Sequence, residues 1–184
     1  ILLPVAKNVN AQNLKGESAL TNAVRTGTPE AVALLLNKGA DVNVKDKDGN
    51  NLGVYLVQSY KPAGKETTAD PFDAKAKLLQ DKGLNLAAAQ KDRNTLYHLA
   101  ITKNDIVLLK KITDLKADIN AKNKDGLTAL HRAAMTSKDD AVLKYLISAG
   151  AKKDINTEFD ETAYALAKEN ELLTKNNVSI DFLK

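Results

Sequence analysis

The two histidines are the side chains best suited to chemistry in this sequence, but their neighbours do not support a reactive role. His98 and His131 each stand two residues before an alanine, at Ala100 and Ala133. A bound metal would need carboxylate or thiolate ligands at helical spacing, and no such residue follows either histidine by three or four positions. We therefore expect neither histidine to be a metal ligand.

Other catalytic arrangements are also missing. No histidine stands in a repeating relation to the serines considered as nucleophiles, which are Ser18, Ser59, Ser137 and Ser148. The sequence has no cysteine, which excludes disulfides, thiolate nucleophiles and cysteine-based metal sites. No phosphate-binding loop is formed by the glycines Gly39, Gly49, Gly83, Gly126 and Gly150. We expect no catalytic residue, no metal and no cofactor, and hence no enzyme.

Composition and charge restrict the class of protein further. The chain has 184 residues, 43% hydrophobic but only 4% aromatic, which favours one domain of helices packed closely through small side chains. The net charge of +4 comes almost entirely from lysine, since the only arginines are Arg25, Arg93 and Arg132. Acidic residues alternate with the lysines, so we expect no nucleic-acid binding. No apolar run is long enough for a membrane span.

Two motifs recur along the chain at a fixed mutual spacing. The first occurs at residues 39–44 (GADVNV) and 116–121 (KADINA), and in weaker form at 6–11 (AKNVNA) and 83–88 (GLNLAA). The second occurs at 16–20 (GESAL), 49–52 (GNNL), 93–100 (RNTLYHLA) and 126–133 (GLTALHRA). Its period is 33 residues from Gly16 to Gly49 and from Arg93 to Gly126, whereas 44 residues separate Gly49 from Arg93. This pattern indicates a repeat protein with an insertion of 11 residues in its second copy.

Each copy has the signals of a turn followed by two short helices. In the first copy, Ser18 can cap one helix, and Thr28 followed by Pro29 can begin a second, which Gly39 ends. The apolar stripes expected to face inward are Leu20, Ala23 and Val24 on the first helix and Val32, Leu35 and Leu36 on the second. Helices this short are unstable alone, so the copies are expected to stack into a solenoid.

The copies resemble ankyrin repeats, a family with units of about 33 residues, each a β-turn and two antiparallel helices. The family pattern D-x-x-G-x-T-P-L-H-x-A is best matched at residues 123–133, and G-A-D-V-N is matched at 39–43. Departures include alanine or leucine at the proline of the motif, and Arg93 and Asp160 at its glycine. The resemblance implies an all-α solenoid of stacked helix–loop–helix units joined by β-turn or hairpin connections. It also implies that His98 and His131 hydrogen-bond to the backbone of adjacent repeats.

We expect a single ankyrin-repeat domain over residues 1–184. Its parts are the end of a partial repeat (1–12), four repeats (13–45, 46–89 with the insertion, 90–122 and 123–156) and a capping repeat (157–184). The insertion falls between Tyr60 and Asp73, where residues 61–71 contain two prolines and one glycine and read as a loop. The loop is expected to end at Asp70, because Pro71 suits a helix start. The alignment of residues 151–157 stays open.

The resemblance further implies binding to another protein through a concave surface of turn tips and first helices, here named the binding strip. By position in the repeat, the strip contains Leu14, Lys15, Glu17, Arg25, Lys47, Asn50, Gln58, Lys91, Asn94, Thr102, Lys103, Lys124, Leu127, Arg132 and Met135. Whether the loop at 61–71 also contacts the partner, and which protein the partner is, stay open. The alternatives are a structural or multimerising spacer, and one lobe of a larger protein whose activity lies elsewhere. We expect a monomer.

The first residues bear on the compartment. Ile1-Leu2-Leu3-Pro4 contains neither an initiating methionine nor the apolar core of a signal peptide. We favour a cytoplasmic location and keep an exported or periplasmic one open, because an export signal could have been removed before Ile1.

Overall fold

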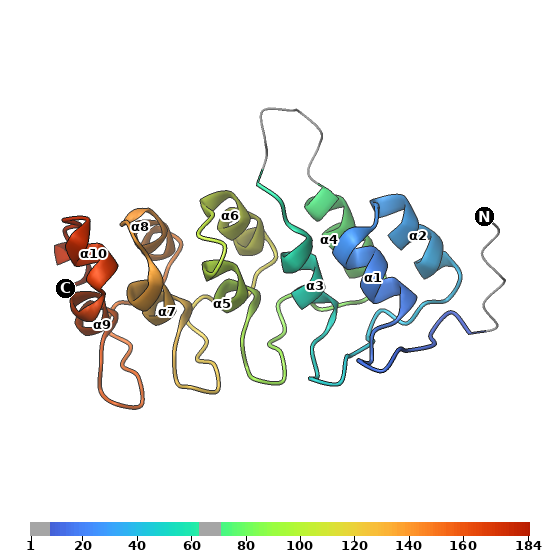
Figure 1. Cartoon of the computed structure of the whole chain (residues 1–184), viewed down its shortest axis with the longest axis horizontal. Coiled ribbons are helices and arrows are strands. Elements are labelled where there is room, and N and C mark those ends of the chain that lie inside the picture. Colours follow the sequence, from blue (N-terminus) through green and yellow to red (C-terminus); the bar gives the residue numbers. More distant parts are fainter. Residues whose placement is uncertain (1–7, 63–70) are drawn as a thin grey trace. The chain divides into compact units, whose positions relative to one another are not determined.

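The structure is a computed structural model that describes residues 8–62 and 71–184, and it forms two compact units (Figure 1). Unit 1, Ile1–Leu86, contains α1 (Ala19–Thr26), α2 (Pro29–Asn37), α3 (Leu52–Ser59) and α4 (Pro71–Asp81). Unit 2, Ala87–Lys184, contains α5 (Leu96–Ile101), α6 (Ile106–Asp114), α7 (Ala129–Thr136), α8 (Ala141–Ser148), α9 (Ala163–Glu169), α10 (Glu171–Lys175) and the 3-10 helix η1 (Asp181–Leu183).

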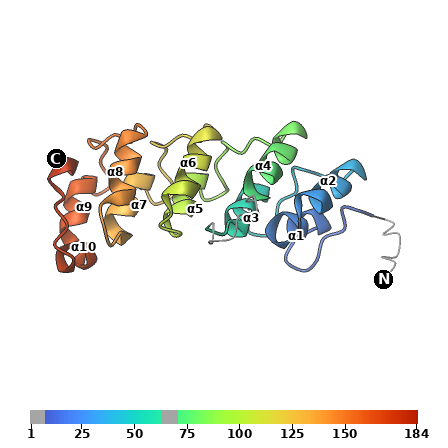
Figure 2. The same cartoon turned by 90° about the horizontal axis from the view of Figure 1, so that it is seen from above.

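In both units the helices are arranged as stacked pairs. Figure 2 shows the two helices of each pair side by side, and consecutive pairs contact each other through α1 and α3, α2 and α4, α5 and α7, and α7 and α9. The described residues contain no strand, only an isolated antiparallel bridge between Gln12 and Ser18. The predicted all-α repeat solenoid is confirmed. The repeat boundaries within it stay a prediction.

The helix ends are determined by local sequence signals. The Ser18 hydroxyl accepts a hydrogen bond from the Thr21 amide at the start of α1, and Thr28 does the same for Ala31 at the start of α2. Pro29 is the first residue of α2, as predicted. Gly39 follows α2 with a φ of 86°, the left-handed conformation expected of a residue that ends a helix.

The core between pairs consists largely of small and aliphatic side chains. Ala129, Ala133 and Ala134 of α7 are fully buried, and so is Ala100 of α5. Alanines at these positions let the backbones of neighbouring helices approach closely. The low aromatic content of the sequence follows from this close packing.

A buried lysine in α4 departs from this apolar pattern. Lys75 is 2% exposed, and its Nζ donates a hydrogen bond of 2.9 Å to the backbone carbonyl of Val24 in α1. Leu108 and Val142, at the equivalent positions of α6 and α8, are fully buried apolar residues. Lys75 therefore joins the two helix pairs of unit 1 through a backbone carbonyl as well as through its aliphatic chain.

The base of the insertion is held by two aromatic rings. Tyr60 directly follows α3 and Phe72 lies in the first turn of α4; both are buried, with ring centroids 6.1 Å apart in an edge-to-face arrangement. Helix α4 begins at Pro71, as predicted. Most of the predicted loop at 61–71 lies outside the described residues. The two aromatic residues that flank it are part of the core.

Candidate binding surface

In each unit the turns between helix pairs project on the same side of the helices (Figure 1). Backbone hydrogen bonds join neighbouring turns: the Lys47 amide donates to the Lys15 carbonyl at 3.0 Å in unit 1, and the Lys124 amide donates to the Asp92 carbonyl at 2.9 Å in unit 2. These bonds keep the turn tips in register, so side chains on successive tips have a defined spacing.

Side chains within the turns also fix their conformation. The Asn13 side-chain oxygen accepts hydrogen bonds from the amides of Lys15 and Glu17, and Asn123 accepts from Asp125 and Leu127 in the same way. The turn acids Asp41, Asp46 and Asp118 accept from backbone amides two or four residues ahead. The tips are rigid supports for the residues that they expose.

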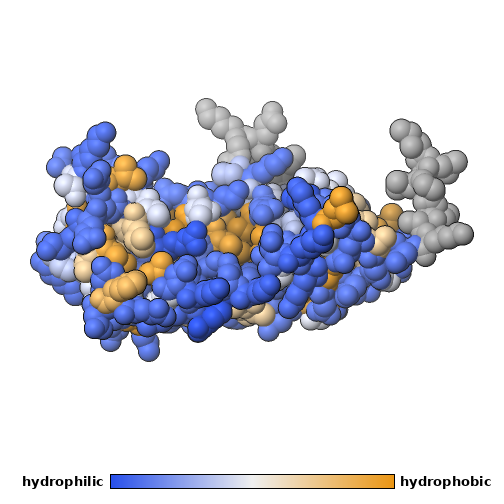
Figure 3. All heavy atoms as spheres, turned by 60° about the horizontal axis from the view of Figure 1, so that its bottom comes forward, coloured by the Kyte–Doolittle hydropathy of each residue, from blue (hydrophilic) through white to orange (hydrophobic). Residues whose placement is uncertain are grey.

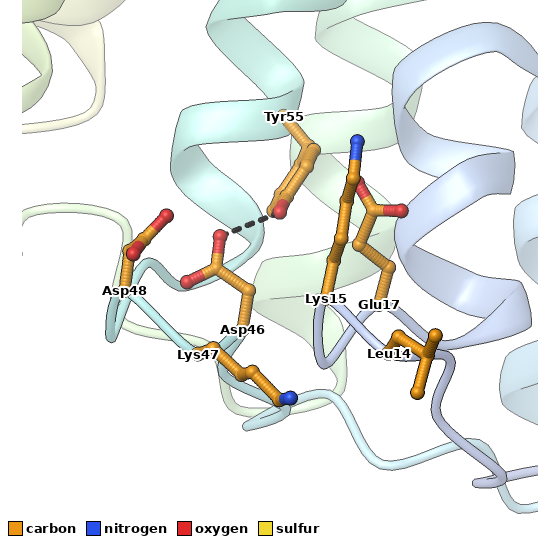
Figure 4. A pocket seen from close by; sticks show the side chains of 7 residues that line it. All are labelled: Leu14, Lys15, Glu17, Asp46, Lys47, Asp48 and Tyr55. Atoms are coloured by element: carbon orange, nitrogen blue, oxygen red, sulfur yellow. Dashed lines mark hydrogen bonds between the residues drawn. The ribbon is translucent and has the colours of Figure 1, made fainter.

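Unit 1 has a pocket of about 420 Å³ between its two turn tips (Figure 4). Four residues of the predicted binding strip line it, and Asp46, Asp48 and Tyr55 complete it; the four are Leu14, Lys15, Glu17 and Lys47. Figure 4 shows Lys15 extending alongside Glu17 and the Tyr55 hydroxyl facing the Asp46 carboxylate. Strip residues from two different repeats thus meet in one concavity.

Polar contacts connect both sides of this pocket. The Arg25 guanidinium is 2.7 Å from the Glu17 carboxylate, and its central carbon lies 5.5 Å from the centroid of the Tyr55 ring. The Tyr55 hydroxyl donates a hydrogen bond of 2.6 Å to Asp46, which also accepts from the Asn50 backbone and side-chain amides. This set of contacts joins α1, α3 and both turns of unit 1.

The electrostatics of the pocket follow from these bonds. Burial raises the pKa of the Asp46 carboxyl, but hydrogen bonds from Tyr55 and Asn50 outweigh it, so the pKa is below its usual value. Burial and the hydrogen bond to Asp46 raise the pKa of Tyr55, which stays protonated and can donate. Hydrogen bonds from Asn13 and then Arg25 lower the pKa of Glu17. Both carboxylates are charged at neutral pH.

These contacts divide the predicted strip residues of unit 1 into two groups. Glu17, Arg25 and Asn50 are half-buried and bonded within the protein, so they support the surface. Lys15, Lys47, Leu14 and Gln58 are exposed, and neither lysine forms an ion pair in the described part of the chain. The second group is the one available to a partner.

Unit 2 shows the same division. Asn94 bonds to Asp92 and accepts from Asn123, and Leu127 and Arg132 are half-buried. The exposed residues of the strip are Lys91, Thr102, Lys103, Lys124 and Met135, the last at 48%. Figure 3, which brings the turns forward, shows a mostly hydrophilic surface with separate hydrophobic patches.

The sequence interpretation missed one exposed aromatic residue on this surface. Phe159 is 82% exposed and follows Glu158, which lies against Gly126 of the preceding turn. It stands 34 residues after Asp125, at the tip of the last turn, so the period of the repeat could have identified it. Strip positions were assigned to four repeats only, and the last turn was interpreted solely as a cap.

The histidines have the structural role that the resemblance implied. His98 Nδ1 accepts a hydrogen bond from the Thr95 amide, and Nε2 lies 2.9 Å from the Leu127 carbonyl in the next repeat. His131 accepts from the Thr128 amide and lies 2.8 Å from the Ile155 carbonyl. An acceptor at Nδ1 and a donor at Nε2 require the neutral ring with its proton on Nε2.

Acidification should destabilise unit 2 through these rings. Burial lowers the pKa of both histidines below the usual 6.5, so the unfolded chain binds more protons than the folded one below that pH. The free energy of unfolding should therefore fall as the pH is lowered from about 7 through about 6.5, until the folded-state pKa values are reached.

The test is urea unfolding at a series of pH values from about 7 to about 5.5. Replacing both rings (His98→Asn with His131→Asn) should flatten the slope in this interval, whatever it does to stability at pH 7. A slope that persists in the double variant would contradict the assignment, because the chain has no other histidine.

Two further searches covered residues 8–62 and 71–184. No group of three or more His, Cys, Asp or Glu side chains there is placed to hold a metal ion. None of the helices in these ranges combines the length and apolar content of a membrane span.

Comparisons with known proteins agree with the repeat architecture. A family model for ankyrin repeats in three copies matches residues 84–179, and a single ankyrin repeat model matches residues 15–47. Neurogenic locus notch homolog protein 1 is similar to 86% of this chain in Homo sapiens (30% identity over 158 residues) and in Xenopus laevis (29%). E3 ubiquitin-protein ligase KEG of Arabidopsis thaliana is 27% identical over 147 residues, 78% of this chain. The matches span only 6 to 8% of the length of these relatives.

Proposed function

This chain belongs to the ankyrin-repeat family, and we propose that it is a non-enzymatic module that binds another protein through its binding strip. Ankyrin repeats generally mediate protein–protein interaction. The activities of the much longer relatives are not transferred, because the chain matches less than a tenth of each. The proposal concerns the surface that the repeats of this chain present.

One observation carries the proposal. The two most exposed large apolar side chains in the described residues, Leu14 at 89% and Phe159 at 82%, both lie at turn tips. The tips are held by side-chain and backbone hydrogen bonds, so little conformational entropy is lost when a partner covers them. Exposed apolar side chains on a rigid support are favourable centres for an interface.

The charges around these residues favour a protein partner over a nucleic acid. A lysine is followed by an aspartate on three turns, at Lys47-Asp48, Lys91-Asp92 and Lys124-Asp125. Such alternation gives no continuous basic path for a phosphate backbone, whereas it suits a partner surface of mixed charge. We also propose that the chain acts as a monomer, with the repeat boundaries given above.

Removing the two tip residues should weaken partner binding by at least tenfold, about 1.4 kcal/mol. The partner is first captured from the source cell, and its affinity is then measured for the double variant Leu14→Ser with Phe159→Ser. Both side chains are solvent-exposed, so the melting temperature should change little.

The matched control replaces two exposed apolar residues on second helices, Leu34→Ser with Val107→Ser, one in each unit. It should change the affinity by less than about twofold, an effect within the usual range for surface substitutions. If the control weakened binding as much as the tip variant, the binding surface would lie elsewhere.

A further inference from the structure

One outer face of α1 and α2 lacks the covering that equivalent faces have. Helices α3 and α4 pack on α1 and α2, and they bury four positions to 2% exposure or less. These positions are Leu52, Leu56, Lys75 and Leu79. The period of the repeat places Ala19, Ala23, Ala31 and Leu35 at the same positions of α1 and α2. Ala19 is exposed, and the other three are only half-buried.

Unit 2 gives the same comparison. Helices α7 and α8 pack on α5 and α6, and bury their four equivalent residues to 1% or less: Ala129, Ala133, Val142 and Leu146. Ala19 and Ala23 are therefore of the same residue type as Ala129 and Ala133, which are fully buried. Leu35, predicted to be core, is half-buried for this reason. The α1–α2 face has the composition of a stacking face without a neighbour on it.

Hydrogen bonds of Asn10 indicate what belongs on this face. Its side chain donates to the Gly39 carbonyl at 3.2 Å and accepts from the Asp41 amide at 2.7 Å. Asn120, at the end of the α5–α6 repeat, makes the same pair of bonds to Gly150 and Lys152 of the following repeat, at 3.1 and 2.8 Å. Asn10 thus occupies the last part of a repeat that precedes α1.

The sequence before Asn10 has matching spacing. Ile1-Leu2-Leu3 stands nine to seven residues before Asn10, as Leu34-Leu35-Leu36 of α2 stands nine to seven residues before Asn43. The apolar triplet has the position of the last turn of a second helix.

We propose that the α1–α2 face, consisting of Ala19, Ala23, Ala31 and Leu35, is a stacking surface for one further helix pair of the same repeat type, the pair that ends in residues 1–3. This inference depends on the fold and not on the proposed function. Its occupant is a repeat within the same polypeptide, joined through the turn that contains Asn10.

The experiment adds a helix pair to the complete chain. Residues 1–6 are replaced by a second copy of residues 90–116, which contains α5 and α6 and ends at the position equivalent to Ala6. Helical circular dichroism should rise in proportion to the added helices. Backbone amides of α1 and α2 should exchange with solvent at least tenfold more slowly, whereas those of α7 and α8 should be unchanged.

A single exposed residue provides the matched variant. Ala19→Glu should have little effect on the original chain, where Ala19 is in solvent, and should abolish the slower exchange in the extended chain. Thr26→Glu, an exposed position at the end of α1, should preserve it. No added helix, unchanged exchange in α1 and α2, or slower exchange that survives Ala19→Glu would each overturn the proposal. So would a dimer of the original chain that Ala19→Glu dissociates, because the occupant would then be a second copy.

Discussion

Replacing Gly16 with alanine should lower the free energy of unfolding by about 3 kcal/mol. Gly16 has a φ of 79°, and a Cβ on it would lie 2.7 Å from the Lys47 backbone nitrogen, on the neighbouring turn. The left-handed conformation alone costs an alanine about 1–2 kcal/mol. The contact with backbone atoms adds about 1–3 kcal/mol, because no flexible side chain can move aside.

Gly39→Ala is the matched control. Gly39 has a φ of 86°, but a Cβ there would meet no atom within 4 Å, so only the backbone term applies. Urea unfolding of both variants, followed by circular dichroism, separates the two contributions. Equal losses would contradict the close approach of the turns in unit 1.

Replacing Phe72 with alanine should cost about 3–5 kcal/mol, the usual range for a buried aromatic residue. Its side chain is 1% exposed and stacks against Tyr60 at the base of the insertion. The variant leaves a cavity between these positions. Thermal unfolding measures the loss.

The contrasting variant replaces residues 63–69 with a two-residue link and keeps Tyr60 and Phe72. The melting temperature should stay nearly constant, because shortening a loop changes its closure entropy little. A large loss of stability in this variant, or none in Phe72→Ala, would show that the two aromatic rings do not hold the insertion's base. Partner affinity of the shortened chain then decides whether the insertion is a contact element.

Short-range signals made much of the fold predictable. Ser18, Thr28 and Pro29 mark helix starts through bonds to residues two or three positions away, and the structure confirms them. The alignment after Gly150, which the sequence left open, depended on a distant contact. Asn120 bonds to the Lys152 amide as Asn10 does to the Asp41 amide, so Lys152 takes the place of Asp41.

The candidate surface was less predictable, because repeat position does not determine side-chain partners. Arg25 and Glu17 occupy variable positions, yet they pair with each other beside Tyr55. Burial of Lys75 depends on the Val24 carbonyl, 51 residues away. Only Phe159 could have been found from the period alone. Positive φ at Arg93 (61°) and Asp160 (58°) shows that the turn keeps its conformation where the motif's glycine is absent.

The affinity of charge-reversed chains for the captured partner tests the central claim most directly. The strip variant carries Lys47→Glu, Lys103→Glu and Lys124→Glu; the control carries Lys38→Glu, Lys110→Glu and Lys175→Glu on or next to second helices. All six lysines are exposed, and both variants have the same net charge. At low ionic strength the strip variant should bind at least tenfold more weakly than the original chain, about 1.4 kcal/mol, and the control should bind like the original. A control that binds as weakly as the strip variant would contradict binding through the turn tips and first helices.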